Sequence, residues 1–206
     1  MNYRQKLDQL KGQYQSALET VEVKTVKIKK LKRKAKYLEE SQQIIQVVAQ
    51  RTQQELEYQV SELVSLAMES TFPNPYNLKL DFVPRRGKTE ADITFHRKGV
   101  SESGVHPLTA SGGGACDVAS LALRFSVWSL SAQKSRPIFL LDEPFKNIND
   151  PSRELHESAA EMLREVCDKL GIQIIVITLM PELIEVADKT FRAKKTKKGV
   201  SKVKEV

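Results

Sequence analysis

The most informative segment of the chain is Ile138-Phe139-Leu140-Leu141-Asp142-Glu143-Pro144. Four apolar residues in a row predict a short buried β-strand, and the proline ends it. The two acidic residues then stand at the carboxyl end of the strand, where ligands bind in open α/β sheets. In nucleoside triphosphatases, one carboxylate at this place holds Mg²⁺ and the next polarises the attacking water. Taken alone the pattern is weak, because apolar runs that end in an acid are common.

A glycine-rich loop precedes this strand and opens an expected helix from about Gly114 to Leu130. It reads Thr109-Ala110-Ser111-Gly112-Gly113-Gly114. Successive glycines leave backbone N–H groups open, Ser111 adds a hydroxyl, and the helix N-terminus carries partial positive charge. Together these groups predict an anion-binding cradle. For a glycine run that stands alone, a flexible loop with a helix cap is the commoner explanation.

The segments around the two motifs alternate between strand and helix patterns. Residues 78–83 alternate as in a half-buried strand, and residues 91–95 form its return strand after a basic turn at 85–88. A helix is expected over 152–170, a second buried strand over 172–179, and a basic hairpin or tail over 190–206. Strand, helix and strand in this order predict an α/β fold with a mostly parallel sheet, crossover helices and a β-hairpin.

Residues 1–68 predict one long coiled-coil helix, followed by a globular domain over 69–206. Apolar residues recur in alternating steps of four and three, which is a heptad seam that only Lys24 interrupts. The seam shifts register at Val60, Leu63 and Ala67, and Phe72-Pro73-Asn74-Pro75 ends the helix. A helix of this length would be about 100 Å long. Its seam therefore needs a partner helix, from a second copy or from a different chain.

Charge is distributed unevenly along the chain, whose net charge is +7. Residues 69–188 carry 13 basic and 17 acidic side chains, whereas residues 189–206 carry 8 basic and one acidic. Another eight basic residues and no acid lie between Lys24 and Lys36. Such blocks attract polyanions through counterion release, although a solvated helix face and a soluble tail would look the same. The candidate DNA contacts are Lys27, Lys30, Lys34, Lys194, Lys195, Lys197 and Lys198.

Several other classes of protein are disfavoured by the sequence. No run of eighteen apolar residues exists, and the first thirty residues lack the apolar core of a signal peptide. The histidines have no metal-ligand spacing. Two cysteines, Cys116 and Cys167, make no disulfide framework, and we expect both to be buried and reduced. We therefore expect an intracellular protein that works with DNA and has no membrane partner.

The order of the motifs resembles the ATP-binding-cassette heads of the SMC family and the SbcC-type coiled-coil ATPases of double-strand-break repair, including small phage-borne versions. Ser111 lies 31 residues before Asp142, with one helix between them. Pro144 follows the carboxylates, then Asn147-Ile148-Asn149-Asp150, and later a strand that ends in Thr178. The residues from Pro181 to Lys189 also look like the segment after the SMC switch strand. The resemblance covers the whole chain, coiled coil included.

The resemblance implies a role for each of these residues. Ser111, Gly112, Gly113 and Gly114 would form the signature that contacts an ATP held by an opposing head. Asp142 would order Mg²⁺, and Glu143 would be the catalytic base. Asn149 stands where the D-loop of the family usually has Asp, and Leu179 follows Thr178 where many cassettes place the switch histidine. The contact between heads is therefore altered, and the sensor of the γ-phosphate has no candidate.

The sequence contains no P-loop, which requires G-x-x-x-x-G-K-[ST]. Gly87-Lys88-Thr89 fails, because the first glycine would fall on Phe82 and the segment lies between two hairpin strands. The related families carry this loop on their N-terminal lobe. Two functions remain: an ATPase lobe for DNA repair, recombination or chromosome maintenance that needs a P-loop-bearing lobe or related ATPase chain, or a non-catalytic DNA-binding or decoy scaffold. Partners implied by the resemblance include DNA and a possible nuclease subunit.

Overall fold

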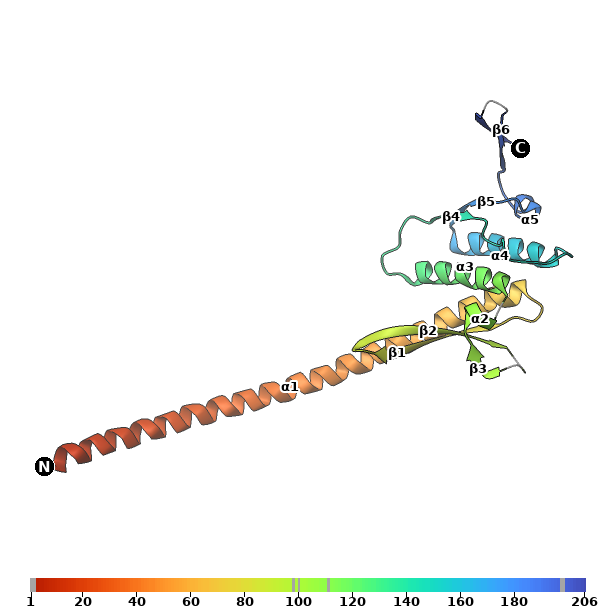
Figure 1. Ribbon diagram of the computed structural model, residues 1–206. Helices are drawn as coiled ribbons and strands as arrows, with labels where there is room; N and C mark the ends of the chain where they lie inside the picture. Colours follow the sequence, from red (N-terminus) through yellow and green to blue (C-terminus); the bar gives the residue numbers. More distant parts are fainter. Residues whose placement is uncertain (1–2, 98, 100, 111, 197–198) are drawn as a thin grey trace. The chain divides into compact units, whose positions relative to one another are not determined.

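The structure is a computed structural model that describes all residues except 1–2, 98, 100, 111 and 197–198. The chain divides into two compact units, residues 1–53 and residues 54–206. Helix α1 (Tyr3–Thr71) begins in the first unit and ends in the second (Figure 1). Among the described residues, no helix is both long and apolar enough to cross a membrane.

The first unit is a single stretch of helix. It contains one glycine and no proline, so nothing in its sequence interrupts the helical hydrogen bonds. All side chains from Tyr3 to Thr52 are exposed, including the seam residues Leu7, Leu10 and Ile28. The predicted helix is therefore confirmed, while its coiled-coil partner stays a prediction.

The last turns of α1 pack into the core of the second unit. Val60, Val64 and Met68 are buried at spacings of four residues, which places them on one face of the helix. Leu63, predicted to lie in the seam, is 42% exposed, whereas Val64 is fully buried. Val64 lies outside the predicted seam and is buried because this part of α1 packs against the core of its own chain.

An antiparallel sheet contains strands β1 (Asn77–Arg85), β2 (Lys88–Arg97) and β3 (Ser101–Val105), in that order. Arg86 and Gly87 connect β1 and β2, with φ angles of 50° and 73°. Two residues of positive φ are what a type I′ hairpin turn requires, which explains the glycine. The predicted hairpin is confirmed, and with it the rejection of this segment as a P-loop. Strand β3 and the short helix α2 (Pro107–Ala110) were not predicted from the sequence.

Helix α1 satisfies the free edge of this sheet. Strand β1 is an edge strand, so alternate backbone N–H groups lack a partner strand. Side chains one helical turn apart on α1 accept these hydrogen bonds. The N–H groups of Leu78, Leu80 and Phe82 donate to Ser65 Oγ at 3.0 Å, Ser61 Oγ at 3.0 Å and Glu57 Oε1 at 2.6 Å. The helix therefore covers an edge that would otherwise be open.

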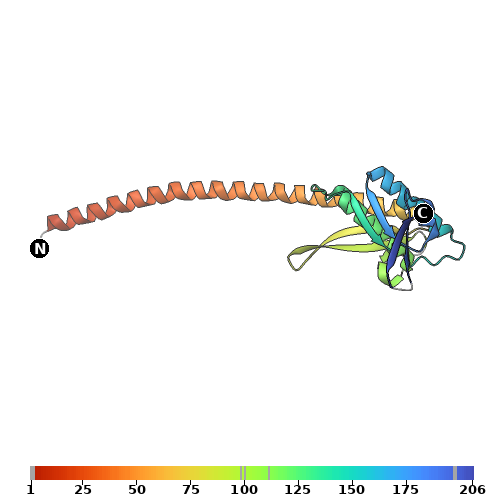
Figure 2. The same ribbon diagram turned by 90° about the horizontal axis from the view of Figure 1, so that it is seen from above.

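A parallel pair of strands forms the second sheet. Strand β4 (Ile138–Asp142) follows helix α3 (Gly113–Leu130), and helix α4 (Glu154–Leu170) crosses over to strand β5 (Gln173–Ile177). Figure 2 shows β4 and β5 side by side. Phe139 packs edge-on against Phe125 and Trp128 of α3, with ring centroids 4.9 and 5.8 Å apart. One face of the pair is thus covered by α3, whose half-buried Trp128 packs against the core.

The rest of the chain forms helix α5 (Pro181–Glu185) and a C-terminal hairpin of strands β6 (Phe191–Lys195) and β7 (Ser201–Glu205). The predicted α/β class is confirmed, but the sheet is not mostly parallel: two of the seven described strands pair in parallel. Within the described residues Cys116 and Cys167 form no disulfide, and both are half-buried, so the prediction of buried cysteines is wrong.

Candidate functional site

The two acidic residues occupy the end of β4. Asp142 is the last residue of the strand and is exposed, and Glu143 is half-buried. The backbone N–H of Glu143 donates to the carbonyl oxygen of Ile177 at 2.9 Å, which extends the parallel ladder by one bond. Glu143 has a φ of 46°, in the left-handed region that a non-glycine residue rarely adopts. The chain therefore turns sharply at Glu143, and the Glu143 side chain does not follow the alternating pattern of the strand.

The face of the β4–β5 pair on which Asp142 lies is not covered. Alternate residues of a strand share a face, so Asp142 lies with Ile138 and Leu140. Leu140 is 75% exposed, and its neighbour Ile175 on β5 is 49% exposed. Ile177 and Leu179 continue this apolar surface at the end of β5. The prediction that both strands are buried is wrong for this face, because no described element of the chain lies over it.

The glycine loop and the turn after Glu143 lie in direct contact. A Cβ atom on Gly113 would stand 2.8 Å from the Cβ of Asn147, and one on Gly114 would stand 3.0 Å from the Cα of Ile148. The first distance is shorter than real Cβ contacts, and the second is tighter than most of them, so the backbone of Ile148 would have to shift. Gly113 and Gly114 therefore allow the loop and the turn to pack closely, a role that was not predicted from the sequence. At Gly112, the N-cap of α3, an added Cβ would meet no atom within 4 Å, and no side chain caps the helix there.

Asp117 holds the turn against α3. Its carboxylate accepts hydrogen bonds from the backbone N–H and the side-chain amide of Asn147, both at 3.0 Å. Phe145 and Ile148 anchor the same turn in the core. Asp117 was not among the residues predicted from the sequence, although it is an acidic residue in the first turns of the helix after the glycines. Asn149, the predicted D-loop residue, follows Ile148 in this turn and is exposed.

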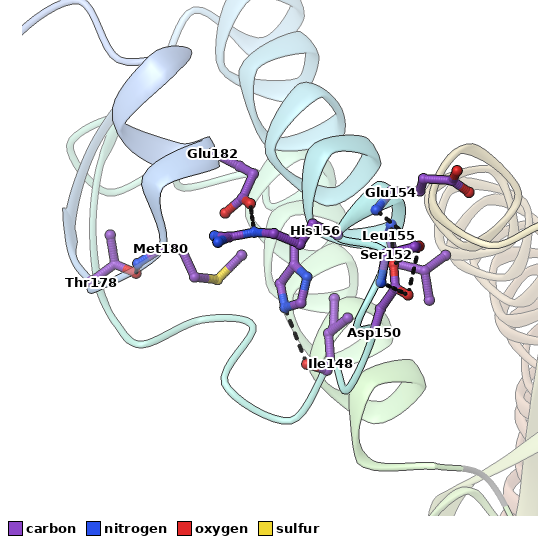
Figure 3. Close-up of polar contacts among 10 residues, drawn as sticks. Ile148, Asp150, Ser152, Glu154, Leu155, His156, Thr178, Met180 and Glu182 are labelled. Atoms are coloured by element: carbon purple, nitrogen blue, oxygen red, sulfur yellow. Dashed lines mark hydrogen bonds and ion pairs between the residues drawn. The ribbon is translucent and has the colours of Figure 1, made fainter.

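A polar cluster connects α4 to the segment that follows β5 (Figure 3). Asp150 accepts hydrogen bonds from the backbone N–H of Leu155 at 2.9 Å and from the hydroxyl of Ser152 at 2.8 Å. These donors, the Leu155 N–H above all, hold the pKa of the Asp150 carboxyl below its usual range. Asp150 thereby caps the start of α4.

Arg153 and Glu182 form the ion pair of this cluster. Arg153 has a φ of 69°, which delays the start of α4 to Glu154 instead of the expected 152. Its guanidinium donates to Glu182 on α5, and this hydrogen bond lowers the pKa of the buried Glu182 carboxyl. His156 Nε2 lies 3.1 Å from the carbonyl oxygen of Ile148, to which it donates. The turn, α4 and α5 are therefore connected by polar contacts that sequence analysis did not find.

The remaining predicted residues lie on several elements. Thr178 follows β5, and its hydroxyl accepts the backbone N–H of Met180 at 3.0 Å, as Figure 3 shows. The exposed residues Lys27, Lys30 and Lys34 lie on α1, and Lys194 and Lys195 lie on β6. Ser111, Lys197 and Lys198 lie outside the described residues. The structure thus brings together Gly113, Gly114 and the turn after Glu143.

The donor atoms at the end of β4 suit magnesium only in part. Carboxylate oxygens are ligands that Mg²⁺ accepts, and the ion is usually held by one or two carboxylates together with substrate phosphates. Within the described part of the chain, no group of three or more His, Cys, Asp or Glu residues could hold a metal ion. Asp142 therefore fits as a ligand of a nucleotide-bound ion and does not complete a cage with its own neighbours.

Comparison with solved structures identifies the fold. It resembles an SMC head domain. An SMC ATPase structure, described in terms of ATP-driven dimerization and DNA-stimulated activation, matches with 21% identity and a TM-score of 0.57 over 77% of this chain and 88% of that chain. The Pyrococcus furiosus Smc head with an extended coiled coil, bound to the C-terminal domain of ScpA, matches with 21% identity and a TM-score of 0.58 over 76% of this chain.

A third SMC head extends this picture. The Pyrococcus yayanosii Smc head with a coiled coil and joint matches with 21% identity and a TM-score of 0.60 over 83% of this chain. The present chain spans 36% of the P. furiosus chain and 30% of the P. yayanosii chain. Comparisons with protein-family models and with curated proteins find no match. The match confirms an SMC-head-like fold that includes part of a long helix.

Proposed function

We propose that this chain is the C-terminal lobe of an SMC- or SbcC-like ATPase head, and that it hydrolyses ATP only after a P-loop-bearing lobe docks against it. The uncovered face of β4–β5 carries this proposal. Parallel sheets are normally covered on both faces, and here Leu140, Ile175 and Ile177 stay exposed around Asp142. A partner lobe would bury this apolar surface and bring its nucleotide to the acidic end of β4.

The residues divide the chemistry between them. Asp142 would hold Mg²⁺, which neutralises charge on the phosphates when it is bound. Glu143 would accept the proton of the attacking water, and its left-handed backbone supports a separate direction for this second carboxylate. Gly112 and the first N–H groups of α3 would contact the phosphate of a nucleotide held by the opposing head, where backbone donors and the helix N-terminus favour negative charge.

The contact between the glycine loop and the turn after Glu143 supports a shared response to nucleotide. Gly113 and Gly114 pack on Asn147 and Ile148, so a shift of α3 must move the turn that carries Asn149. We propose that, through this contact, the engagement of two heads affects the position of the acidic residues. The work done would be ATP-driven clamping or processing of DNA inside the cell, in repair, recombination or chromosome maintenance.

The test is reconstitution of the composite enzyme. The partner to test is a chain encoded beside this one, if that chain contains G-x-x-x-x-G-K-[ST] and a coiled coil. We expect ATP hydrolysis from the mixture and none from either chain, and weak binding of Mg-ATP to this chain by calorimetry, because the phosphate cradle and its lysine are missing. Micromolar ATP affinity of this chain alone would contradict the half-head, and a mixture that associates without hydrolysis would favour the scaffold.

The role of Glu143 has its own measurement. In the active complex, Glu143→Gln should lower turnover by about 10²-fold or more, as expected for loss of a general base, while ATP binding and head engagement persist. Glu161→Gln removes the same charge from an exposed position of α4 and should leave turnover unchanged. Hydrolysis at the parental rate by Glu143→Gln would exclude this residue as the base.

A further inference from the structure

The C-terminal hairpin is a formed structure with its own turn. The backbone N–H of Thr196 donates to the carbonyl oxygen of Val200 at 2.8 Å, and the Thr196 hydroxyl donates to the same oxygen at 2.9 Å. Gly199 has a φ of 79°, which suits glycine in the turn. At the open end, the N–H of Val206 donates to the carbonyl oxygen of Thr190 at 3.0 Å. The register of β6 and β7 is therefore fixed at both ends.

This register sorts the side chains into two unlike faces. Arg192 pairs with Lys204, and Lys194 pairs with Lys202. Because paired residues and alternate residues of a strand share a face, these four cations lie together, and we call them the basic face. The opposite face contains Phe191, Ala193 and Val203 with Lys195, Ser201 and Glu205. The sequence placed Lys194 and Lys195 in one candidate set, but the register separates them.

The basic face lacks internal compensation. Like charges directly opposite each other destabilise an antiparallel pair, and this hairpin has two such pairs in succession. All four side chains are exposed, and no ion pair between described residues involves any of them. A two-stranded hairpin is only marginally stable by itself. An anionic partner would remove the repulsion and stabilise the hairpin at the same time.

We propose that the basic face binds the phosphate backbone of duplex DNA. Cross-strand neighbours have Cβ atoms about 5 Å apart, and alternate residues of a strand are about 7 Å apart. Four positive charges therefore occupy a small patch, and duplex DNA offers a matching density of about one negative charge per 1.7 Å of its axis. The contact is with phosphates, so it carries no sequence preference.

Duplex DNA fits the two faces better than a lipid surface does. A membrane would bury Phe191, Ala193 and Val203, and this orientation turns the four cations away from the headgroups. DNA leaves the apolar face free and engages the basic face alone. The proposal rests on the DNA-associated role proposed above for its choice of nucleic acid, but it does not depend on ATP hydrolysis.

The experiment measures binding of a short labelled duplex to the full chain by fluorescence anisotropy over a series of salt concentrations. The variant R192Q/K194Q/K202Q/K204Q should bind at least about tenfold more weakly, and its salt slope should fall by up to about 3.6, at about 0.9 for each lost phosphate contact. The matched control K11Q/R51Q/K88Q/R136Q loses the same charge from other exposed positions and should keep its slope. Equal losses in both variants would overturn the proposal.

Two adjacent residues test the face itself. Lys194→Gln should lower the slope by about 0.9, whereas Lys195→Gln, on the opposite face, should change it little. A Lys-to-Arg variant at 194, 202 and 204 should retain binding, which separates charge loss from misfolding. If K27Q/K30Q/K34Q removes the salt dependence and the hairpin variant does not, the DNA site lies on α1 and the proposal is wrong.

Two further outcomes distinguish this site from other ligands and from the proposed ATPase. Stronger competition by phosphatidylserine vesicles or by polyglutamate than by unlabelled duplex would contradict a DNA site. DNA binding is measured on this chain without its partner, and ATPase activity is measured on the complex without DNA. A hairpin that does not bind DNA therefore leaves the composite head untouched, and an inactive composite head leaves the DNA measurement valid.

Discussion

The antiparallel sheet of β1, β2 and β3 and the parallel pair of β4 and β5 differ in how much of their surface the chain covers itself. The antiparallel sheet packs Leu78, Leu80 and Phe95 into the core, and α1 occupies its β1 edge. The parallel pair has one face against α3, while Leu140 and Ile177 on the other face are 75% and 66% exposed. The first sheet serves the stability of this chain. The second presents Asp142 on an open apolar face, so we infer that it serves assembly.

The difference also separates two kinds of apolar residue that look alike in sequence. Ile138 to Leu141 is a uniform apolar run, yet Leu141 is buried and Leu140 is not. A residue of the covered face contributes to the folding free energy of this chain. A residue of the open face would contribute to the binding free energy of a partner lobe, and its exposure in the single chain is a cost in solubility.

The largest expected effect comes from this adjacent pair. Leu141→Ala should lower the free energy of unfolding by about 2–5 kcal/mol, because it leaves a cavity in the core. Leu140→Ala should change it by less than about 0.5 kcal/mol, as expected for an exposed position. Urea unfolding followed by circular dichroism measures both. Similar losses for the two variants would show that the open face is covered in solution by something other than a docking lobe.

A smaller effect should distinguish the glycines in the same way. Gly114→Ala places a Cβ 3.0 Å from Ile148 and should cost about 1–3 kcal/mol, because the turn has to move. Gly112→Ala enters open space at a φ of −64° and should be nearly neutral for stability. Thermal unfolding of both variants provides the comparison. A neutral Gly114→Ala would mean that the turn after Glu143 is not packed against α3.

The smallest effect concerns the covered edge. Ser61→Ala removes the acceptor of the Leu80 N–H and should cost about 1 kcal/mol, the usual value of one such hydrogen bond. Ser41→Ala is the control, since the Ser41 hydroxyl donates to a carbonyl of its own exposed helix. Amide exchange at Leu80 should accelerate in the first variant and not in the second. Unchanged exchange would show that α1 does not hold this edge.

Much of the fold could be predicted from periodicity and turn residues. The long helix, the hairpin with its Arg86-Gly87 turn, and α3 follow from local patterns that the structure confirms. The burial of Val64 was not predicted, because the heptad pattern describes contacts with a partner helix and this part of α1 packs on the core. The exposure of Leu140 was missed, because an apolar run indicates burial and cannot tell whether the covering element belongs to the same chain.

The candidate site was predictable in its residue types and less so in its contacts. The order of the glycine loop, the acidic pair and the turn can be read directly from the sequence. The clamp of Asp117 on Asn147 spans 30 residues, and the pair of Arg153 and Glu182 spans 29. No local pattern specifies such pairs, since they depend on how α3, α4 and α5 pack. The steric role of Gly113 and Gly114 likewise became apparent only when the turn was seen against them.

The three hydrogen bonds from β1 to α1 join a strand and a helix whose donor and acceptor spacings nearly match. Their acceptors Glu57, Ser61 and Ser65 are spaced by about 6 Å along the helix, and their donors are spaced by about 6.7 Å along the strand. Because the two spacings nearly agree, a slide of α1 along β1 by less than one spacing strains all three hydrogen bonds together. The end of α1 therefore cannot slide along β1 without straining these bonds. A force along the helix axis would be transmitted directly to the sheet.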